Sequence, residues 1–133
     1  IIFGRVSYDN ETLHQLLDVA KVLASLVNDP AHHRIILAST DLMHYVPREE
    51  AYRMDQLALQ AVQEVDGERL LEVVFRHDIS MCGVMPTATM LFALRKLGIT
   101  RGEVLCHYTS GDVPGGDTRH VVGYSACAFY RSA

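Results

Sequence analysis

The sequence has no tryptophan, only three cysteines and no long apolar run among its 133 residues. Cys82, Cys106 and Cys127 make an odd number without regular spacing, which argues against a disulfide framework and indicates a reducing compartment. No apolar stretch approaches the length of a membrane-spanning helix, and no basic segment followed by an apolar one opens the chain. These absences predict a cytoplasmic protein with no membrane partner.

A strong excess of charge is also lacking. Lysine and arginine number 12 and aspartate and glutamate 16, so the formal net charge is −4. A chain of this kind does not attract nucleic acid through its overall charge, and we expect no nucleic-acid partner. The length predicts one domain over residues 1–133, because no repeat, low-complexity segment or linker divides it.

The chain does not begin with methionine, and its first three residues, Ile1, Ile2 and Phe3, resemble a strand that has already begun. We therefore expect residues 1–133 to be the C-terminal portion of a larger fold. In that case apolar surface would be exposed where the neighbouring strands of the sheet belong, and the chain would be prone to self-association.

The hydrophobic pattern predicts helices and strands in alternation. Apolar residues spaced by three and four predict helices over residues 9–27, 48–65, 68–76 and 86–97. Apolar runs predict strands over residues 1–3, 34–39, 103–110 and 121–130. The order indicates an α/β class, with a layered α/β/α arrangement around a mixed β-sheet whose last two strands are antiparallel.

The stretch "STDLMHY" follows the predicted strand at 34–39 and carries the first candidate site. Ligands gather at the carboxyl ends of strands in layered α/β folds. The spacing of Asp41 and His44 can bring a carboxylate and an imidazole to one side, as a pair of metal ligands or as an acid that orients a base. The pattern is short, and taken alone it favours the structural alternative, a turn that Asp41 caps and a histidine with a structural role.

The stretch "SMCGVMP" carries the second candidate. Cys82 lies just ahead of the helix predicted to begin at Pro86, where the helix dipole favours a thiolate that can bind metal or attack an electrophile. Gly83 permits a sharp turn or a close approach of a ligand. The alternative is that Cys82 is a small buried hydrophobic residue, as we expect for Cys106 and Cys127.

The loop "TSGDVPGGDTRH" gathers the third set of polar residues, Asp112, Asp117, Arg119 and His120. Turn chemistry explains most of its composition. A long loop of this kind can also form the edge of a binding site.

Taken together, the stretches "LASTDLMHY", "ISMCGVMPTATML" and "YTSGD…VVGYSACAF" resemble the Memo family, which in prokaryotes is also called AmmeMemoRadiSam system protein B. The resemblance spans essentially the whole chain. It implies a fold similar to that of the class III extradiol dioxygenases, non-haem iron enzymes that cleave catechol rings. It also implies that these residues correspond to the C-terminal part of a longer family chain.

The resemblance implies roles for individual residues. Asp41 and His44 match the aspartate and histidine of the family's "SSD-x-x-H" motif, and Cys82 matches the cysteine of its "CG" motif. These three would be ligands in a pocket that holds a divalent metal, iron or copper. Ser39 matches the first serine, and Thr40 replaces the second but keeps the hydroxyl. The family's other metal-site histidines lie in N-terminal motifs that have no counterpart here.

The resemblance implies two possible functions, and a third interpretation gives these residues a structural role only. In the first, His44 and Cys82 are catalytic, Ser39, Thr40, Gly83 and Asp112 line the pocket, and the metal supports redox chemistry on a small molecule. In the second, the pocket is a vestige and the protein binds a peptide or protein partner in signalling. In the third, the polar residues only cap turns. A cysteine ligand counts against ordinary ring cleavage.

Overall fold

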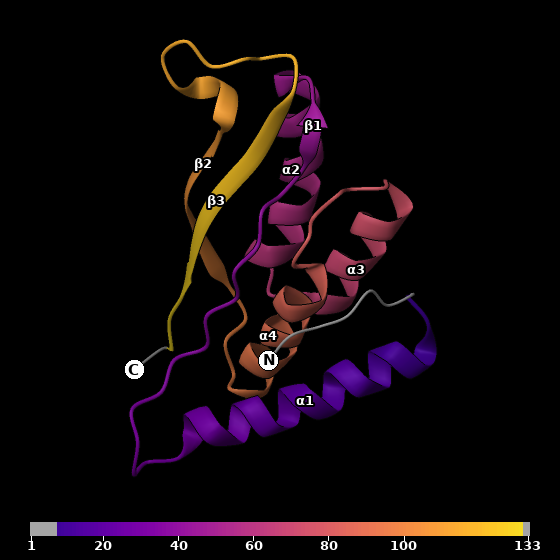
Figure 1. The fold of residues 1–133 in the computed structure, drawn as a ribbon. Helices are drawn as coiled ribbons and strands as arrows, with labels where there is room; N and C mark the ends of the chain where they lie inside the picture. Colours follow the sequence, from indigo (N-terminus) through magenta and orange to yellow (C-terminus); the bar gives the residue numbers. More distant parts are fainter. Residues whose placement is uncertain (1–7, 132–133) are drawn as a thin grey trace.

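A computed structural model describes residues 8–131 of the chain (Figure 1). The predicted strand at 1–3 lies outside the described residues. The elements follow in the order α1 (Asn10–Asn28), β1 (His44–Val46), α2 (Arg48–Gln63), α3 (Gly67–Arg76), α4 (Val84–Lys96), β2 (Gly102–Thr109), a short 3-10 helix η1 (Ser110–Asp112) and β3 (Val121–Phe129). This arrangement confirms the predicted α/β class.

The four helices begin and end where local chemistry favours it. The carboxylate of Asp9 accepts a hydrogen bond from the backbone N–H of Thr12 and caps α1. Asp66 caps α3 in the same way through the N–H of Arg69. Gly98, at φ 81°, follows the end of α4, as glycine commonly does after a helix. All four predicted helices are confirmed, with boundaries shifted by two residues or fewer.

The sheet has the order β1-β3-β2, and both of its pairings are antiparallel. The predicted antiparallel pair at the end of the chain is therefore confirmed as the β2–β3 hairpin. Helix α2 packs against both strands of this hairpin, α3 packs against α2, and α4 packs against α3 and α1 (Figure 1). The residues that the structure describes contain no parallel pairing, so the sheet within 8–131 is antiparallel and not mixed.

The predicted strand at 34–39 is wrong for the described structure. These residues take part in neither of the two strand pairings. Ile36 and Ala38 pack against the core, whereas Ile35 is 89% and Leu37 85% exposed. An apolar run is typical of a strand that helices cover on both faces, but here only one side of the run finds a partner. Ile35 and Leu37 thus expose apolar surface; that neighbouring strands belong there, and that the chain self-associates, stay predictions.

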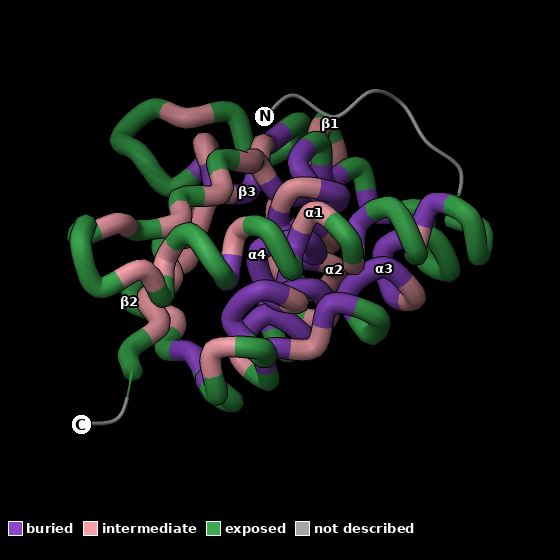
Figure 2. Tube along the Cα trace, turned by 90° about the horizontal axis from the view of Figure 1, so that it is seen from below, coloured by how far each residue is buried: buried purple, intermediate pink, exposed green. Residues whose placement is uncertain are grey.

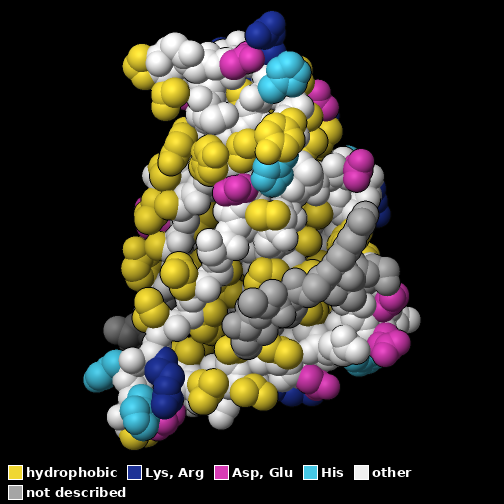
Figure 3. Space-filling view, viewed as in Figure 1, with side chains coloured by type: hydrophobic (Ala, Val, Ile, Leu, Met, Phe, Trp, Pro, Cys, Tyr) yellow, Lys and Arg dark blue, Asp and Glu magenta, His cyan; other side chains and the backbone are white. Residues whose placement is uncertain are grey.

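The core lies between the helices and one face of the sheet (Figure 2). Its most deeply buried large side chains include Val65, Leu70, Leu71, Leu91 and Val121. No helix within residues 8–131 is long and apolar enough to cross a membrane. Hydrophobic side chains also reach the surface in many places on the face seen in Figure 3.

Candidate metal centre

The structure brings Asp41, His44 and Cys82 together. Each offers one ligand atom, and the three atoms lie within 4.8 Å of one another. The Nε2 atom of His44 lies 3.6 Å from the Oδ2 atom of Asp41. Asp41 lies in the segment before β1, His44 is the first residue of β1, and the turn before α4 supplies Cys82. Two stretches about 40 residues apart in the sequence therefore meet in one site, and ligand roles for these residues stay a prediction.

A hydrogen bond fixes the imidazole of His44. Its Nδ1 atom lies 2.7 Å from the backbone carbonyl oxygen of Ser80. Because a carbonyl can only accept, Nδ1 donates its proton to Ser80, and Nε2 is left as the ring nitrogen on the side of Asp41 that could bind a metal in the neutral imidazole. The hydroxyl of Ser80 also accepts a hydrogen bond from the backbone N–H of His44, at 2.8 Å. Metal-binding histidines in proteins are commonly oriented by a hydrogen bond of this kind.

Contacts from the Thr40–Asp41 segment hold the sulfur of Cys82. The backbone N–H of Asp41 donates to Sγ at 3.4 Å, and the hydroxyl of Thr40 lies 3.7 Å from it. The same hydroxyl accepts from the N–H of Gly83 at 2.8 Å. A Cβ atom at Gly83 would lie 2.8 Å from the carbonyl oxygen of Ser39, so a glycine is needed for this close approach.

A buried carboxylate supports the loop that carries Asp41 and His44. Asp55, on α2, is fully buried, and its Oδ1 atom accepts the backbone N–H of Met43 at 2.8 Å. Its Oδ2 atom lies 2.9 Å from Nε2 of His107 on β2. Burial raises the pKa of Asp55, and the hydrogen bonds from His107 and Met43 partly oppose that shift. The loop is thereby tied to both α2 and the hairpin.

Sequence reasoning missed Asp55 and His107. They lie 52 residues apart, so no local pattern relates them. One signal was present, because the helical spacing of Ala51, Asp55 and Ala58 places an acidic residue on the inner face of α2. A buried acid requires a partner, and this spacing alone predicts that one exists.

Tyr45 follows His44 in a strained conformation. Its φ is 59°, in the left-handed region that residues other than glycine rarely adopt. Its side chain is 74% exposed, and its ring centroid lies 5.8 Å from that of His44. Such strain persists where the surroundings hold a residue in place, and it often marks a functional site.

Asp112 is the last residue of η1 and links the start of the loop after β2 to α2. Its Oδ2 atom accepts hydrogen bonds from the hydroxyl of Tyr52 at 2.7 Å and from the N–H of Thr109 at 2.6 Å. Its Oδ1 atom lies 3.6 Å from the guanidinium of Arg48. The hydrogen bond from Tyr52 is the largest of the effects that lower the pKa of Asp112. These contacts have a structural role, and pocket-lining by Asp112 stays a prediction.

We expect iodoacetamide at neutral pH to alkylate Cys82 first and Cys127 last. Cys82 is exposed and lies at the N-terminal end of α4, where the helix dipole attracts negative charge. Burial raises the pKa of the Cys127 thiol, which slows its reaction. Mass spectrometry of timed samples measures the three rates. Alkylation of Cys127 as fast as that of Cys82 would contradict this order.

Comparison with known proteins agrees with the motifs. A sequence profile of the family described as "Memo-like protein" matches residues 5–128. A MEMO1 family protein of Methanopyrus kandleri is 36% identical over 114 residues, which are 86% of this chain and 40% of that protein. The MEMO1 family protein of Methanococcus maripaludis is 34% identical over 124 residues, which are 93% of this chain and 43% of that protein.

These matches extend over most of the chain, but they cover less than half of each relative. A MEMO1 family protein of Ignicoccus hospitalis, 41% identical over 95 residues, is covered for only 33% of its length. The chain thus spans about 40% of the length of the relatives from Methanopyrus kandleri and Methanococcus maripaludis. The resemblance inferred from the three motifs is confirmed, and the chain belongs to the Memo family.

Proposed function

We propose that Asp41, His44 and Cys82 bind a divalent metal, iron or copper, and that the site supports redox chemistry on a small molecule. The convergence of the three ligand atoms within 4.8 Å carries this proposal. The orientation of His44 adds to it, because Ser80 engages Nδ1 and leaves Nε2, 3.6 Å from Asp41, as the nitrogen available to a metal.

The donor set fits such a metal. A nitrogen, an oxygen and a sulfur donor together suit a transition metal better than magnesium or calcium, which prefer oxygen. With metal–ligand bonds of about 2.1 Å, neighbouring ligands in a tetrahedral site lie roughly 3.4 Å apart. The separation of 3.6 Å between His44 Nε2 and Asp41 Oδ2 is close to this value. The other two separations in the triad are at most 4.8 Å, so the Cys82 sulfur would have to move closer for all three to bind one ion.

Each residue then has a defined task. His44 and Asp41 hold the ion, and Ser80 fixes the imidazole ring through its carbonyl. Cys82 serves as a ligand or as a redox-active thiolate. A bound iron or copper ion would supply Lewis-acid and electron-transfer chemistry, and three protein ligands leave coordination positions open for a substrate.

A second function, binding of a peptide or protein partner without catalysis, has its own support. Cys82 is exposed and the Asp41 side chain is 47% exposed, so the site is open to large ligands. Tyr45 presents an exposed aromatic ring beside it. Aromatic residues are common anchors in protein interfaces.

We also propose the cytoplasm as the location of the protein. The three cysteines are free, which suits a reducing compartment. The net charge of −4 gives no reason to expect a nucleic-acid partner.

Metal analysis of the chain, purified without chelator, tests the first function. We expect one iron or copper ion per chain, lost in His44→Ala and in Cys82→Ser because each variant removes one of the three ligands. The matched controls are His14→Ala, an exposed histidine on α1, and Cys106→Ser, an exposed cysteine on β2; both should retain the metal. Metal content unchanged in His44→Ala and Cys82→Ser would refute the assignment. Metal-free protein that binds a peptide through this site would favour the second function.

A further inference from the structure

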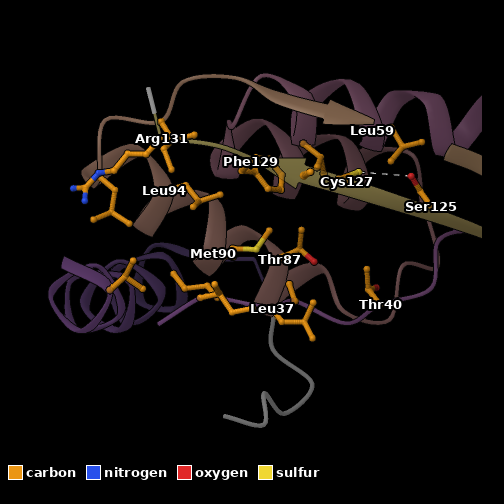
Figure 4. A pocket seen from close by; sticks show the side chains of 18 of the residues that line it. Leu37, Thr40, Leu59, Thr87, Met90, Leu94, Ser125, Cys127, Phe129 and Arg131 are labelled. Atoms are coloured by element: carbon orange, nitrogen blue, oxygen red, sulfur yellow. Dashed lines mark hydrogen bonds between the residues drawn. The ribbon is translucent and has the colours of Figure 1, made fainter. Parts of the chain in front are cut away.

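A cavity of about 460 Å³ lies beside the candidate metal centre. Its walls come from the extended segment 34–40, from α2 and α4, and from β3 (Figure 4). Thr40, which also contacts the sulfur of Cys82, lies at one end, and Arg131 lies at the other. Pockets for small ligands commonly measure about 300–1,000 Å³, so the volume suits a ligand of moderate size.

The middle of the cavity is apolar. Leu59, Met90, Leu94 and Phe129 line it from three different elements. The hydroxyl groups nearby are already committed to the protein. The Thr87 hydroxyl donates to the carbonyl oxygen of Gly83, at 2.8 Å. The Ser125 hydroxyl likewise donates to the carbonyl oxygen of Cys106, at 2.7 Å. A hydrocarbon chain would therefore gain more in this space than a polar molecule.

The end of the cavity nearest α1 is positively charged. Arg34 and Arg131 both line it. Arg34 is balanced by Asp29, at 2.9 Å, whereas Arg131 donates to the neutral amide oxygen of Asn28, at 2.8 Å. No carboxylate within residues 8–131 lies at ion-pair distance from Arg131. Arg131 is exposed at this end of the cavity, and a bound anion could pair with its guanidinium through charge-assisted hydrogen bonds.

We propose that this cavity binds an aliphatic monocarboxylate of the fatty-acid type. Its alkyl chain lies along Leu94 and Met90 toward Thr40, and its carboxylate pairs with Arg131. The combination of an apolar interior with a guanidinium at the mouth that has no carboxylate partner among residues 8–131 selects this chemistry over a neutral or cationic ligand. The proposal does not depend on metal binding, because none of the three candidate ligands lines the cavity.

Cys127 provides a direct report of occupancy. It lies on the wall of the cavity, and burial raises the pKa of its thiol. Cys106, on the neighbouring strand, is exposed and does not line the cavity, so it serves as an internal reference. A bound alkyl chain should slow alkylation of Cys127 by iodoacetamide at least tenfold, while the rate at Cys106 stays the same.

Calorimetric titration with dodecanoate, kept below its micelle concentration, tests the charge and the chain length. Each buried methylene adds about fourfold to affinity, so decanoate should bind roughly fifteenfold more weakly. Arg131→Gln should weaken dodecanoate binding about tenfold or more. Arg101→Gln, which changes an exposed arginine outside the cavity, should leave it unchanged. Dodecylamine, with the opposite charge on the same chain, should not bind.

Cavity filling provides a second test. Ala38→Phe places a ring in the space and should abolish both the calorimetric signal and the protection of Cys127. If that variant does not fold, the effect of dodecanoate on the alkylation rate of Cys127 in the unmodified chain still tests the proposal. Absence of protection by dodecanoate, or equal binding of dodecylamine, would overturn the proposal. So would preferential binding of an uncharged, end-capped apolar hexapeptide, because this would identify the cavity as a place for an added strand.

Discussion

Replacing Gly123 by alanine should lower the free energy of unfolding by about 3 kcal/mol or more. A Cβ atom at this position would overlap Oδ2 of Asp55 and lie 2.8 Å from its Cγ. Asp55 cannot yield, because it is fully buried and both of its oxygens are engaged, with Met43 and with His107. Denaturation by urea, followed by circular dichroism, measures the change.

Gly98→Ala is the matched control. Gly98 has a φ of 81° and nothing within 4 Å of an added Cβ, so this variant bears only conformational strain, about 1 kcal/mol. Similar losses in the two variants would show that the contact between Gly123 and Asp55 is less tight than the structure indicates. A larger loss of stability in Gly123→Ala than in Gly98→Ala would indicate that the backbone of β3 contacts Asp55 directly, the residue that supports the loop carrying Asp41 and His44.

Asp55→Ala should destabilise the protein by about 3–5 kcal/mol at neutral pH. The substitution leaves the buried N–H of Met43 without an acceptor and removes the carboxylate from His107. It should also weaken metal binding, because Met43 directly precedes His44 and the loop would lose its attachment to α2. Asp55→Asn is the conservative comparison, since its amide oxygen can still accept from Met43.

The dependence of stability on pH separates charge from hydrogen bonding at Asp55. Burial raises the pKa of the folded-state carboxyl above its ordinary value of 3.8, so the folded protein holds this proton more tightly than the unfolded chain. Stability from this group is therefore greatest below about pH 4 and falls as the pH rises through the folded-state pKa. Asp55→Asn lacks this titration. As the pH rises, the native protein should lose stability relative to Asp55→Asn. If the native protein instead gained stability relative to Asp55→Asn, the raised pKa of Asp55 would be contradicted.

The helices and the final hairpin could be predicted because their signals are local. Caps such as Asp9, the stop at Gly98 and apolar residues at helical spacing act within a few positions of one another. The β2–β3 pair is likewise joined by a single loop, and both strands carry their own apolar pattern. A segment can be predicted from the sequence where the residues that determine its structure lie within the segment itself.

The segment 34–39 shows why the rest could not be predicted. Its apolar run is typical of a buried strand, but strand formation also requires partners, and in the described structure β3 pairs with β1 and β2 only. The short strand β1, at His44–Val46, was missed because three residues give no periodicity. Whether an apolar run becomes a strand depends on distant residues that no local pattern reveals.

The candidate site was predicted in part. Asp41, His44 and Cys82 were singled out by their places beside a predicted strand and a helix start, and the structure brings them together. The groups that orient them were not found. Ser80 acts through its backbone carbonyl, which has no residue-type signature, and Asp55 acts on the loop from a different helix.

Exposed and partly buried residues alternate over 35–38, just before the loop that carries Asp41 and His44, and this pattern offers a practical route to crystallisation. Ile35 and Leu37 face solvent, while Ile36 and Ala38 hold the segment on the core. Lysine or glutamate at the two outer positions would reduce the exposed apolar area and leave the contacts of Ile36 and Ala38 unchanged, although it would also place charge on the wall of the apolar cavity, which Ile35 and Leu37 line. Such a surface-engineered variant would keep Asp41 and His44 in place and allow the concentrated samples that crystals and metal spectroscopy demand.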